Sequence, residues 1–340
     1  MEKVKIGIVG MGRMGLTHFS IINTHPSVDV VAVADTSTIM LDMLKKLIPA
    51  LKTFTDYKDL LNSGAVDGII VCTPSPLHYQ VCKMAYEKGI HVFCEKPFTT
   101  DPKMAEELAN MFETKGLVNQ VGYVYRFDSV FKEVKRLIDE QVLGKICHVN
   151  VQFLSSTISK VQKEKGWRSK RENGGGATYE MGSHVIDLMD FFFGCPQKII
   201  GTQTNQVYSE AVEDICDAQA LYADNISVNI HVNWCDYTYR KPMMKIDIHG
   251  TKGKIQADLY GYKLFLRDEN KEKALPQGWT IVPMNMIKDD CKFYVRGTSF
   301  TNQLYDFADA IIESRKAVGC SFRSAVNTQK FIHRIFNDNK

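Results

Sequence analysis

Unbroken apolar runs alternate with segments of helical periodicity along the first part of the chain. The apolar runs predict strands at residues 5–9, 28–34, 68–72, 90–94 and 118–121. Amphipathic patterns between them predict helices at residues 12–23, 38–47, 76–88 and 102–115. Strands without polar alternation are typical of a parallel sheet that helices cover on both faces. This part of the chain therefore predicts an α/β fold with a doubly wound parallel sheet.

The pattern changes near residue 123. After a helix at 129–140, alternating segments predict strands at 146–154, 198–207, 218–223, 227–234, 244–249 and 253–259. We expect one face of this second sheet to pack on a core and its polar face to meet solvent or another subunit. Helices are predicted at 301–314 and 321–336. The expected domains are therefore residues 1–123 and an α+β domain over residues 124–340.

Composition and charge argue against several classes of protein. Of the 340 residues, 44% are hydrophobic and 24% are charged, which is typical of a soluble globular protein. Lysine and arginine number 42 against 39 aspartate and glutamate, so the net charge of +3 exerts no strong attraction on nucleic acid. The longest apolar stretch, 185–195, contains Asp187 and Asp190, which argues against a membrane span.

The nine cysteines are scattered along the chain and never form a CxxC pair. This pattern predicts reduced, mostly buried thiols rather than a zinc site or a disulfide framework. The N-terminal apolar run is cut short by glycines and then by Arg13, unlike a signal peptide. We expect a cytoplasmic protein.

A glycine-rich segment follows the first predicted strand and opens the first predicted helix. Its residues are Gly10, Met11, Gly12, Arg13, Met14 and Gly15. Glycines at this spacing permit a tight turn and a close approach of backbone amides to a pyrophosphate, and the helix N-terminus attracts the anion. Asp35 stands twenty residues after Gly15 at the end of the second strand, where a carboxylate accepts ribose hydroxyls. The segment with Asp35 predicts a dinucleotide site.

Asp35 also favours NAD over NADP, because a carboxylate repels a 2′-phosphate. The next residues, Thr36, Ser37 and Thr38, provide no cation to bind that phosphate. Arg13 leaves NADP open as the cofactor, since its guanidinium could reach the adenine ribose.

Further candidates follow two other strands, at the edge where doubly wound sheets bind ligands. Thr73, Pro74 and His78 follow the strand at 68–72 and are predicted to contact the cofactor, although His78 is equally well a helix residue without chemistry. Glu95 and Lys96 precede Pro97, and this X-Pro bond is a candidate cis bond. A lysine that shares an edge with a dinucleotide loop is expected to face the substrate.

The second domain contains a cluster from Gly174 to Asp187. Three consecutive glycines, 174–176, would allow a ligand to approach the backbone closely. Glu180 and His184 are four residues apart and would share a helix face, which suits acid/base chemistry or metal binding. We disfavour a metal because no third ligand is near. A structural role, with a buried and hydrogen-bonded histidine, is the alternative.

Four residues outside this cluster are weaker candidates. Trp167 and Arg168 precede the glycines and could form a wall and an anchor for nicotinamide or substrate. Tyr123 and Arg126 follow the last strand of the first domain and could reach the cofactor. The alternatives are a surface loop for the first two, core packing for Tyr123 and a surface ion pair for Arg126.

The ordered set of motifs closely resembles the glucose-fructose oxidoreductase and inositol dehydrogenase family from end to end. The motifs are Gly10-x-Gly12-x-x-Gly15, Asp35, Thr73-Pro74, Glu95-Lys96-Pro97, Arg126, Leu143-Gly144-Lys145, Gly166-Trp167-Arg168 and the 174–187 cluster. The resemblance implies an N-terminal Rossmann domain and a C-terminal domain with an open-faced, mainly antiparallel sheet. It also implies subunit contacts through that sheet, as in a homodimer or homotetramer.

By this resemblance the enzyme uses NAD or NADP and no metal, and it acts on a hydroxyl or keto carbon of a sugar, cyclitol or related compound. Lys96 is then the catalytic-site lysine, and His184 stands at the usual acid/base position. Glu180 stands where many members have aspartate, so its role in orienting substrate or histidine is less defined. The substrate-binding residues implied are Lys96, Tyr123, Arg126, Glu180 and His184.

Three functions compete at this point. The first is a dehydrogenase or reductase of sugars or polyols that exchanges its cofactor freely. The second is a glycoside hydrolase of the same fold that retains NAD and oxidises its substrate transiently. The third is a non-catalytic NAD(P) sensor, which Lys96 and His184 argue against because a sensor needs neither.

Overall fold

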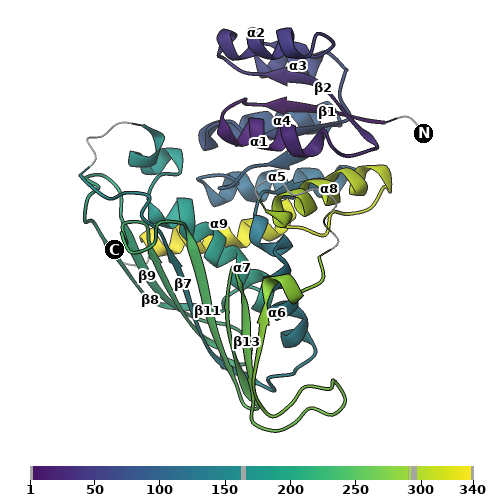
Figure 1. The fold of residues 1–340 in the computed structure, drawn as a ribbon. Coiled ribbons are helices and arrows are strands. Elements are labelled where there is room, and N and C mark those ends of the chain that lie inside the picture. The colour runs from purple at the N-terminus through teal and green to yellow at the C-terminus, as the bar shows by residue number, and fades with distance from the viewer. Residues whose placement is uncertain (1–2, 162–165, 290, 292–296, 338–340) are drawn as a thin grey trace. The chain divides into compact units, whose positions relative to one another are not determined.

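The computed structural model describes residues 3–161, 166–289, 291 and 297–337 (Figure 1). The chain forms two compact units. Unit 1 contains residues 1–127 and 291–329, and unit 2 contains residues 128–290 and 330–340.

Unit 1 is built on a six-stranded parallel sheet with the order β3-β2-β1-β4-β5-β6. The strands are β1 Val4–Val9, β2 Val28–Ala34, β3 Lys52–Phe54, β4 Gly68–Val71, β5 His91–Cys94 and β6 Asn119–Val121. The connecting helices are α1 Arg13–Ile22, α2 Thr38–Leu47, α3 Tyr57–Asn62, α4 His78–Glu87 and α5 Pro102–Lys115. The strand order reverses between β1 and β4, which places a ligand crevice at the carboxyl ends of these strands. The predicted doubly wound sheet is confirmed.

Apolar side chains on both faces stabilise this sheet. Every residue of β4 is buried, and successive side chains of this strand point to opposite faces of the sheet. Ile69 and Val71 belong to one hydrophobic cluster, and Ile70 belongs to the other. Burial on both faces explains why the strands read as unbroken apolar runs.

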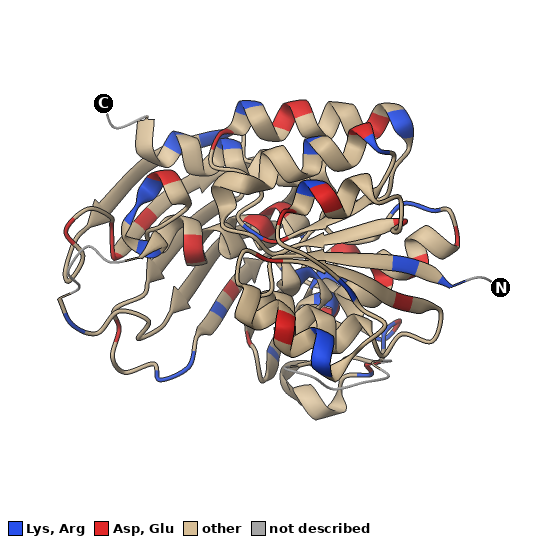
Figure 2. Cartoon of the chain, turned by 90° about the horizontal axis from the view of Figure 1, so that it is seen from above, with Lys and Arg blue, Asp and Glu red and all other residues tan. Residues whose placement is uncertain are grey.

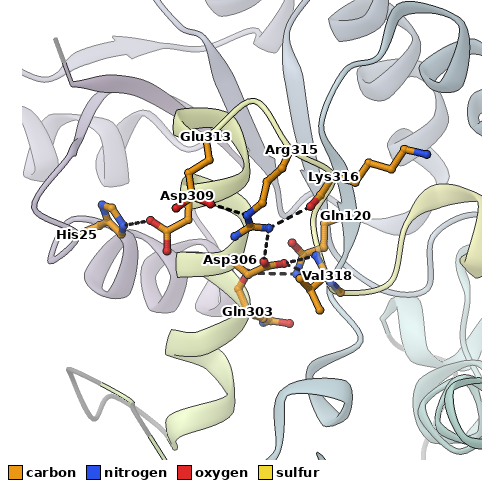
Figure 3. Close-up of polar contacts among 10 residues, drawn as sticks. His25, Gln120, Gln303, Asp306, Asp309, Glu313, Arg315, Lys316 and Val318 are labelled. Atoms are coloured by element: carbon orange, nitrogen blue, oxygen red, sulfur yellow. Dashed lines mark hydrogen bonds and ion pairs between the residues drawn. The ribbon is translucent and has the colours of Figure 1, made fainter. Parts of the chain in front are cut away.

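Helix α8, Thr298–Ile312, belongs to unit 1 although it lies near the end of the chain. Leu304 and Phe307 of α8 join the cluster that contains Ile70. Polar contacts surround this apolar face (Figure 3). They include His25 Nε2 to Asp309 Oδ1 at 3.0 Å, Gln120 Nε2 to the Gln303 carbonyl at 3.1 Å, and Arg315 Nη1 to Asp306 Oδ1 at 2.8 Å.

The bounds of the two units differ from the expected division into residues 1–123 and 124–340. Residues 124–127 and 291–329 lie with the first unit, and the division falls inside helix α9, Phe322–Asn337. The sequence pattern marks where strand periodicity changes along the chain. It does not show which distant core an amphipathic helix covers.

Unit 2 contains an eight-stranded sheet with the order β14-β13-β12-β11-β7-β10-β9-β8. Its strands are β7 Ile146–Leu154, β8 Lys198–Asn205, β9 Ile215–Leu221, β10 Ser227–Asn233, β11 Met243–Gly250, β12 Gly253–Asp258, β13 Gly261–Leu266 and β14 Gly278–Pro283. Strands β7 and β10 pair in parallel, and the other described pairs are antiparallel. The mainly antiparallel sheet is thus confirmed.

Helices α6, Ser129–Asp139, and α7, Ser183–Phe193, pack on one face of this sheet (Figure 1). Alternate residues of β10 are buried toward that side. The opposite face carries polar pairs between neighbouring strands. Asn229 donates to Asn150 Oδ1 at 3.1 Å, and His231 Nδ1 lies 2.7 Å from Asp217 Oδ1.

Acidic and basic residues are interspersed on the helices and loops of both units (Figure 2). This distribution agrees with the small net charge of +3. All nine cysteine side chains are thiols rather than half-cystines, and five of them are buried. Among the described residues, no helix is both long and apolar enough to cross a membrane.

Candidate active site

The glycine-rich loop of unit 1 connects β1 to α1, as the sequence predicts. Gly10 has φ +94°, and a Cβ built there would lie 2.7 Å from the Cys72 carbonyl oxygen. A Cβ on Gly15 would lie 1.9 Å from the Gly10 carbonyl oxygen. Both positions need glycine because the loop, β4 and α1 approach one another too closely for a side chain.

Gly12 differs because its missing side chain leaves open space. It lies at the N-cap of α1, and a Cβ there would meet no described atom within 4 Å. Thr73 follows β4 at the same carboxyl edge of the sheet, and its buried Oγ1 has no hydrogen-bond partner in the described part of the chain. Open space at a helix N-terminus suits a pyrophosphate. The loop residues therefore fit a dinucleotide.

The other loop residues have different environments. Met11 is buried in the unit 1 core, Met14 is half-buried, and Arg13 is exposed in the first turn of α1. Only Arg13 therefore offers a long polar side chain to the solvent side of the loop. Its role in NADP binding stays a prediction.

Asp35 follows β2 and contacts the glycine-rich loop directly. Its Oδ2 accepts a hydrogen bond from the Met11 backbone N–H at 2.6 Å, and its Oδ1 accepts one from Ser37 N–H at 2.8 Å. The carboxylate thus holds the loop in addition to any contact with a ribose. Sequence spacing indicated the ribose contact but not this second role.

His78 links the two strand-end loops of unit 1. It is 1% exposed, and its Nε2 lies 2.9 Å from the Thr73 carbonyl oxygen while its Nδ1 lies 3.0 Å from that of Pro97. Burial lowers the pKa of His78, although these carbonyl oxygens oppose the shift. Backbone groups enclose the ring, so its visible role is to fix the loops that carry Thr73 and Lys96. Pro74, between them, is exposed.

Lys96 follows β5 and is half-buried, and the Lys96–Pro97 peptide bond is cis. The preceding Glu95 is buried, with its Oε1 2.5 Å from His18 Nε2 and its Oε2 3.1 Å from Lys96 N. Burial raises the pKa of Glu95, but the hydrogen bond and charge of His18, together with Lys96, lower it to below its ordinary value. Glu95 is therefore a buried anion directed toward α1.

Sequence reasoning did not find His18. Its position could have indicated that it is buried, because His18 lies three residues after Gly15 on the same helix face, which packs on the sheet. Of the two weaker candidates in unit 1, Tyr123 is buried in the core. Arg126 donates from Nη2 to Ser324 Oγ at 2.8 Å. For both, the predicted role in binding stays a prediction.

The candidate acid/base residues of unit 2 lie on a helix, as predicted. A π-helical turn, Thr178–Gly182, continues directly into α7. In the fully described stretch from Gly174 to Met189, only Glu180 and His184 are not buried. Their spacing of four residues places both on the one accessible face of this stretch. Single π-turns of this kind are frequent at functional sites.

Glu180 is paired with Arg168. Arg168 Nη2 lies 3.2 Å from Glu180 Oε1, and its guanidinium lies 4.6 Å from the centroid of the Trp167 ring. Trp167 is 38% exposed. His184 lies edge-on to Phe153, with the ring centroids 6.1 Å apart. The loop before the glycines therefore supplies a cation to the candidate carboxylate.

Two of the three glycines at 174–176, Gly175 and Gly176, accommodate the protein itself. A Cβ on Gly175 would lie 2.3 Å from the Arg168 carbonyl oxygen, and one on Gly176 would lie 2.4 Å from Glu213 Oε1. Glu213 Oε1 also accepts a hydrogen bond from Thr178 N–H at 3.0 Å. The expected close approach of a ligand is therefore wrong at Gly175 and Gly176, because Glu213 and the 168–170 backbone fill that space. At Gly174 it stays a prediction.

Two family models match the chain. A model described as an oxidoreductase family with an NAD-binding Rossmann fold matches residues 4–123, and the GFO/IDH/MocA C-terminal domain matches residues 131–256. Together they span well over half of the 340 residues. The chain belongs to the GFO/IDH/MocA oxidoreductase family. The predicted resemblance and the NAD-binding character of the Rossmann domain are thus confirmed.

Relatives of this chain with named activities differ in their reactions. The scyllo-inositol 2-dehydrogenase (NADP(+)) IolW of Bacillus subtilis is 29% identical over 202 residues, which are 58% of this chain and 54% of IolW. The 2,7-anhydro-N-acetylneuraminate hydratase of Mediterraneibacter gnavus is 28% identical over 266 residues, which are 76% of this chain and 68% of that protein. This chain therefore matches about half the length of IolW.

The fold extends over nearly the whole chain of a solved structure. Levoglucosan dehydrogenase in complex with NADH and levoglucosan superposes with a TM-score of 0.87 at 17% identity. The superposition covers 98% of this chain and 96% of that one. At this identity the likeness establishes the fold alone.

Proposed function

We propose that this protein is an NAD(P)-dependent oxidoreductase that transfers hydride between nicotinamide and a hydroxyl or keto carbon of a sugar, cyclitol or sugar derivative. The observation that carries the proposal is the accessible Glu180–His184 face in an otherwise buried stretch. Unit 1 of the same chain supplies the dinucleotide loop and Lys96. Membership of an oxidoreductase family supports the same reaction class.

His184 acts as the general base in this proposal. Its Nδ1 is buried, so Nε2 is the nitrogen that receives the hydroxyl proton of the substrate. An imidazole has a reference pKa of about 6.5 and suits proton transfer near neutral pH. In the reductive direction the same nitrogen returns the proton to the carbonyl oxygen.

Lys96 stabilises the substrate oxygen as it gains negative charge. Its ammonium group donates a hydrogen bond there and favours alkoxide character during proton loss. NAD, when bound, supplies the hydride acceptor. The open space at Gly12 and the unpaired Thr73 Oγ1 are where the chain holds the cofactor phosphates and neighbouring groups.

Glu180 orients the substrate with Arg168. The carboxylate accepts hydrogen bonds from substrate hydroxyls, and the 3.2 Å ion pair with Arg168 fixes its direction. Trp167, stacked against that guanidinium, supplies an apolar surface for a sugar ring or nicotinamide.

NAD is the proposed preferred cofactor. We expect Asp35→Asn to shift the NADP-to-NAD affinity ratio toward NADP by about tenfold, which corresponds to ~1.4 kcal/mol, because the variant removes the charge that repels a 2′-phosphate. Asparagine still offers one acceptor oxygen to the loop. Dissociation constants for both cofactors, measured by calorimetry, test this. Asp42→Asn, an exposed charge on α2, is the matched control. An unchanged ratio would remove Asp35 from the ribose site.

Absorbance at 340 nm tests the reaction. The purified protein, first checked for retained cofactor, is mixed with NAD or NADP and a panel of inositols, aldoses, sugar acids and sugar nucleotides. We expect cofactor reduction with one substrate class. The proposal would be contradicted if no substrate of the panel changed the absorbance at 340 nm and the protein held its cofactor weakly and exchangeably.

A second candidate is a reaction without net oxidation, in which the protein retains NAD and oxidises a sugar carbon transiently. The relative named as a hydratase, which aligns over 76% of this chain, favours keeping it. Tightly held NAD together with product release but no net reduction would support this candidate over the first.

We further propose that the protein is a homodimer or homotetramer assembled through the polar face of the unit 2 sheet. The Asn229–Asn150 pair lies at the centre of that face. Light scattering should give twice or four times the chain mass of 38.6 kDa. Asn229→Lys should shift the mass toward the monomer, because it places a charge in the interface. A monomeric wild type at micromolar concentration would contradict the proposal.

A further inference from the structure

A buried histidine–glutamate pair lies next to the candidate catalytic lysine. His18 is fully buried on α1, and its Nε2 lies 2.5 Å from Glu95 Oε1. The other oxygen of Glu95 accepts the Lys96 backbone N–H at 3.1 Å. The pair therefore joins the helix that follows the glycine-rich loop to the residue that carries the ammonium group.

The surroundings of the pair leave little freedom. A Cβ on Gly122 would lie 3.1 to 3.3 Å from three atoms of the Glu95 carboxyl group. The His18 ring lies edge-on to Phe93, with centroids 5.4 Å apart, and 6.2 Å from the Phe300 ring. Nδ1 of His18 is buried and has no hydrogen-bond partner in the described ranges. The polar contact of this ring is thus directed to Glu95.

A buried carboxylate is costly unless it is paired and hydrogen-bonded. Here His18 and the Lys96 backbone N–H supply the bonds, and attraction to Lys96 further favours the anion. The arrangement maintains a fixed negative charge beside Lys96. None of the roles proposed above for catalysis uses this charge.

We propose that His18 and Glu95 are positioning residues for Lys96. His18 holds the Glu95 carboxylate against Gly122, and the carboxylate fixes the Lys96 backbone and attracts its ammonium group. The lysine is thereby held at a defined place relative to the glycine-rich loop. This inference rests on the proposed function, in which Lys96 acts on the substrate oxygen.

Other ionisable groups near the pair are Cys72, Cys94 and His78. Burial raises the pKa of both thiols, and the Glu95 charge adds to the shift. Burial lowers the pKa of His78 although Glu95 opposes it. The two thiols therefore keep their protons from pH 5 to 8, and any titration of His78 is common to both His18 variants and cancels in their comparison.

The test compares His18→Gln with His18→Leu. Glutamine can place an N–H donor close to the position of the imidazole Nε2, whereas leucine fills similar space without a donor. His18→Gln should retain turnover within about threefold of wild type. His18→Leu should lower kcat about tenfold or more with little change in the Kd for NAD, because small displacements of a catalytic group are costly.

Stability of the cofactor-free protein supplies a second readout. In wild type the lowered pKa of Glu95 adds stability above the unfolded pKa of about 4.3, and this stability is lost as pH falls through the folded pKa. In His18→Leu, burial should raise the folded pKa of Glu95 above its unfolded value. The Tm deficit of His18→Leu relative to His18→Gln should therefore widen as pH rises from 5 to 8.

The kcat deficit should follow the opposite trend. It should be largest at low pH, where Glu95 of His18→Leu is protonated, and should shrink as the carboxylate ionises. A merely structural role would make the two deficits change together. In a Glu95→Gln background, the Tm difference between the two His18 variants should lose its pH dependence.

Trace acetylation of the cofactor-free protein, read by mass spectrometry, reports on Lys96 without turnover. Lys96 should react faster in His18→Leu than in His18→Gln, with Lys3 as the internal reference. If wild type has no turnover, the proposed function fails, and the Tm and acetylation measurements still decide the role of the pair. Equal acetylation in both variants, or deficits in kcat and Tm that change in parallel with pH, would overturn the inference.

Discussion

Replacing His184 by asparagine should lower kcat by ~10²-fold or more while the Kd for NAD stays within a few fold. The variant keeps a polar side chain at an accessible position of the helix but cannot take a proton at neutral pH. It should retain the wild-type Tm, because the position is not buried and its ring contact with Phe153 is limited to an edge.

The pH profile identifies the cause of the loss. A general base must be neutral, so oxidation by wild type should fall as pH drops below the pKa of the imidazole in the enzyme–substrate complex. The asparagine variant should lack this acid limb. Turnover within threefold of wild type, or an acid limb that persists unchanged, would exclude His184 as the base.

Replacing Lys96 by methionine should have a comparable effect on turnover. Methionine has a similar length but donates no hydrogen bond, and loss of one donor to a developing oxyanion typically costs 10²–10³-fold in kcat. The substrate deuterated at the reacting carbon should show a larger isotope effect on kcat in the variant, because hydride transfer becomes the slow step. Steady-state rates at 340 nm with both substrates give the measurement.

Lys96→Arg is the matched control for charge. Arginine keeps the cation but places it differently, so its kcat should lie between those of wild type and Lys96→Met. A normal kcat in Lys96→Met with a weakened Kd for NAD would mean that Lys96 only binds the cofactor. That outcome would also remove the reason for positioning it through Glu95.

Local patterns predicted the parts of the site that a few neighbouring residues define. The turn at Gly10 to Gly15 depends on strand, turn and helix signals that are adjacent in sequence, and the structure has them in that order. The shared face of Glu180 and His184 follows from helical spacing alone. The parallel sheet was readable because burial on both faces leaves unbroken apolar runs.

Contacts between distant segments were not predictable in this way. His18 and Glu95 are 77 residues apart, and no spacing rule joins them. The sequence predicted that a ligand would approach the glycines at 174–176, but Glu213, on a different segment, fills the space at Gly176. Short strands such as β3, with three residues, give too little pattern to detect.

The sequence by itself determined most of the strands and helices of the two sheets, the nucleotide-binding turn and the chemical groups available for catalysis. These follow from periodicity, backbone conformational preference and side-chain chemistry, which act over a few residues. The tertiary structure alone decided which core α8 covers, which carboxylate the His18 ring pairs with, and which glycines face open space. Those outcomes depend on packing and desolvation, and these bring together residues far apart in the chain.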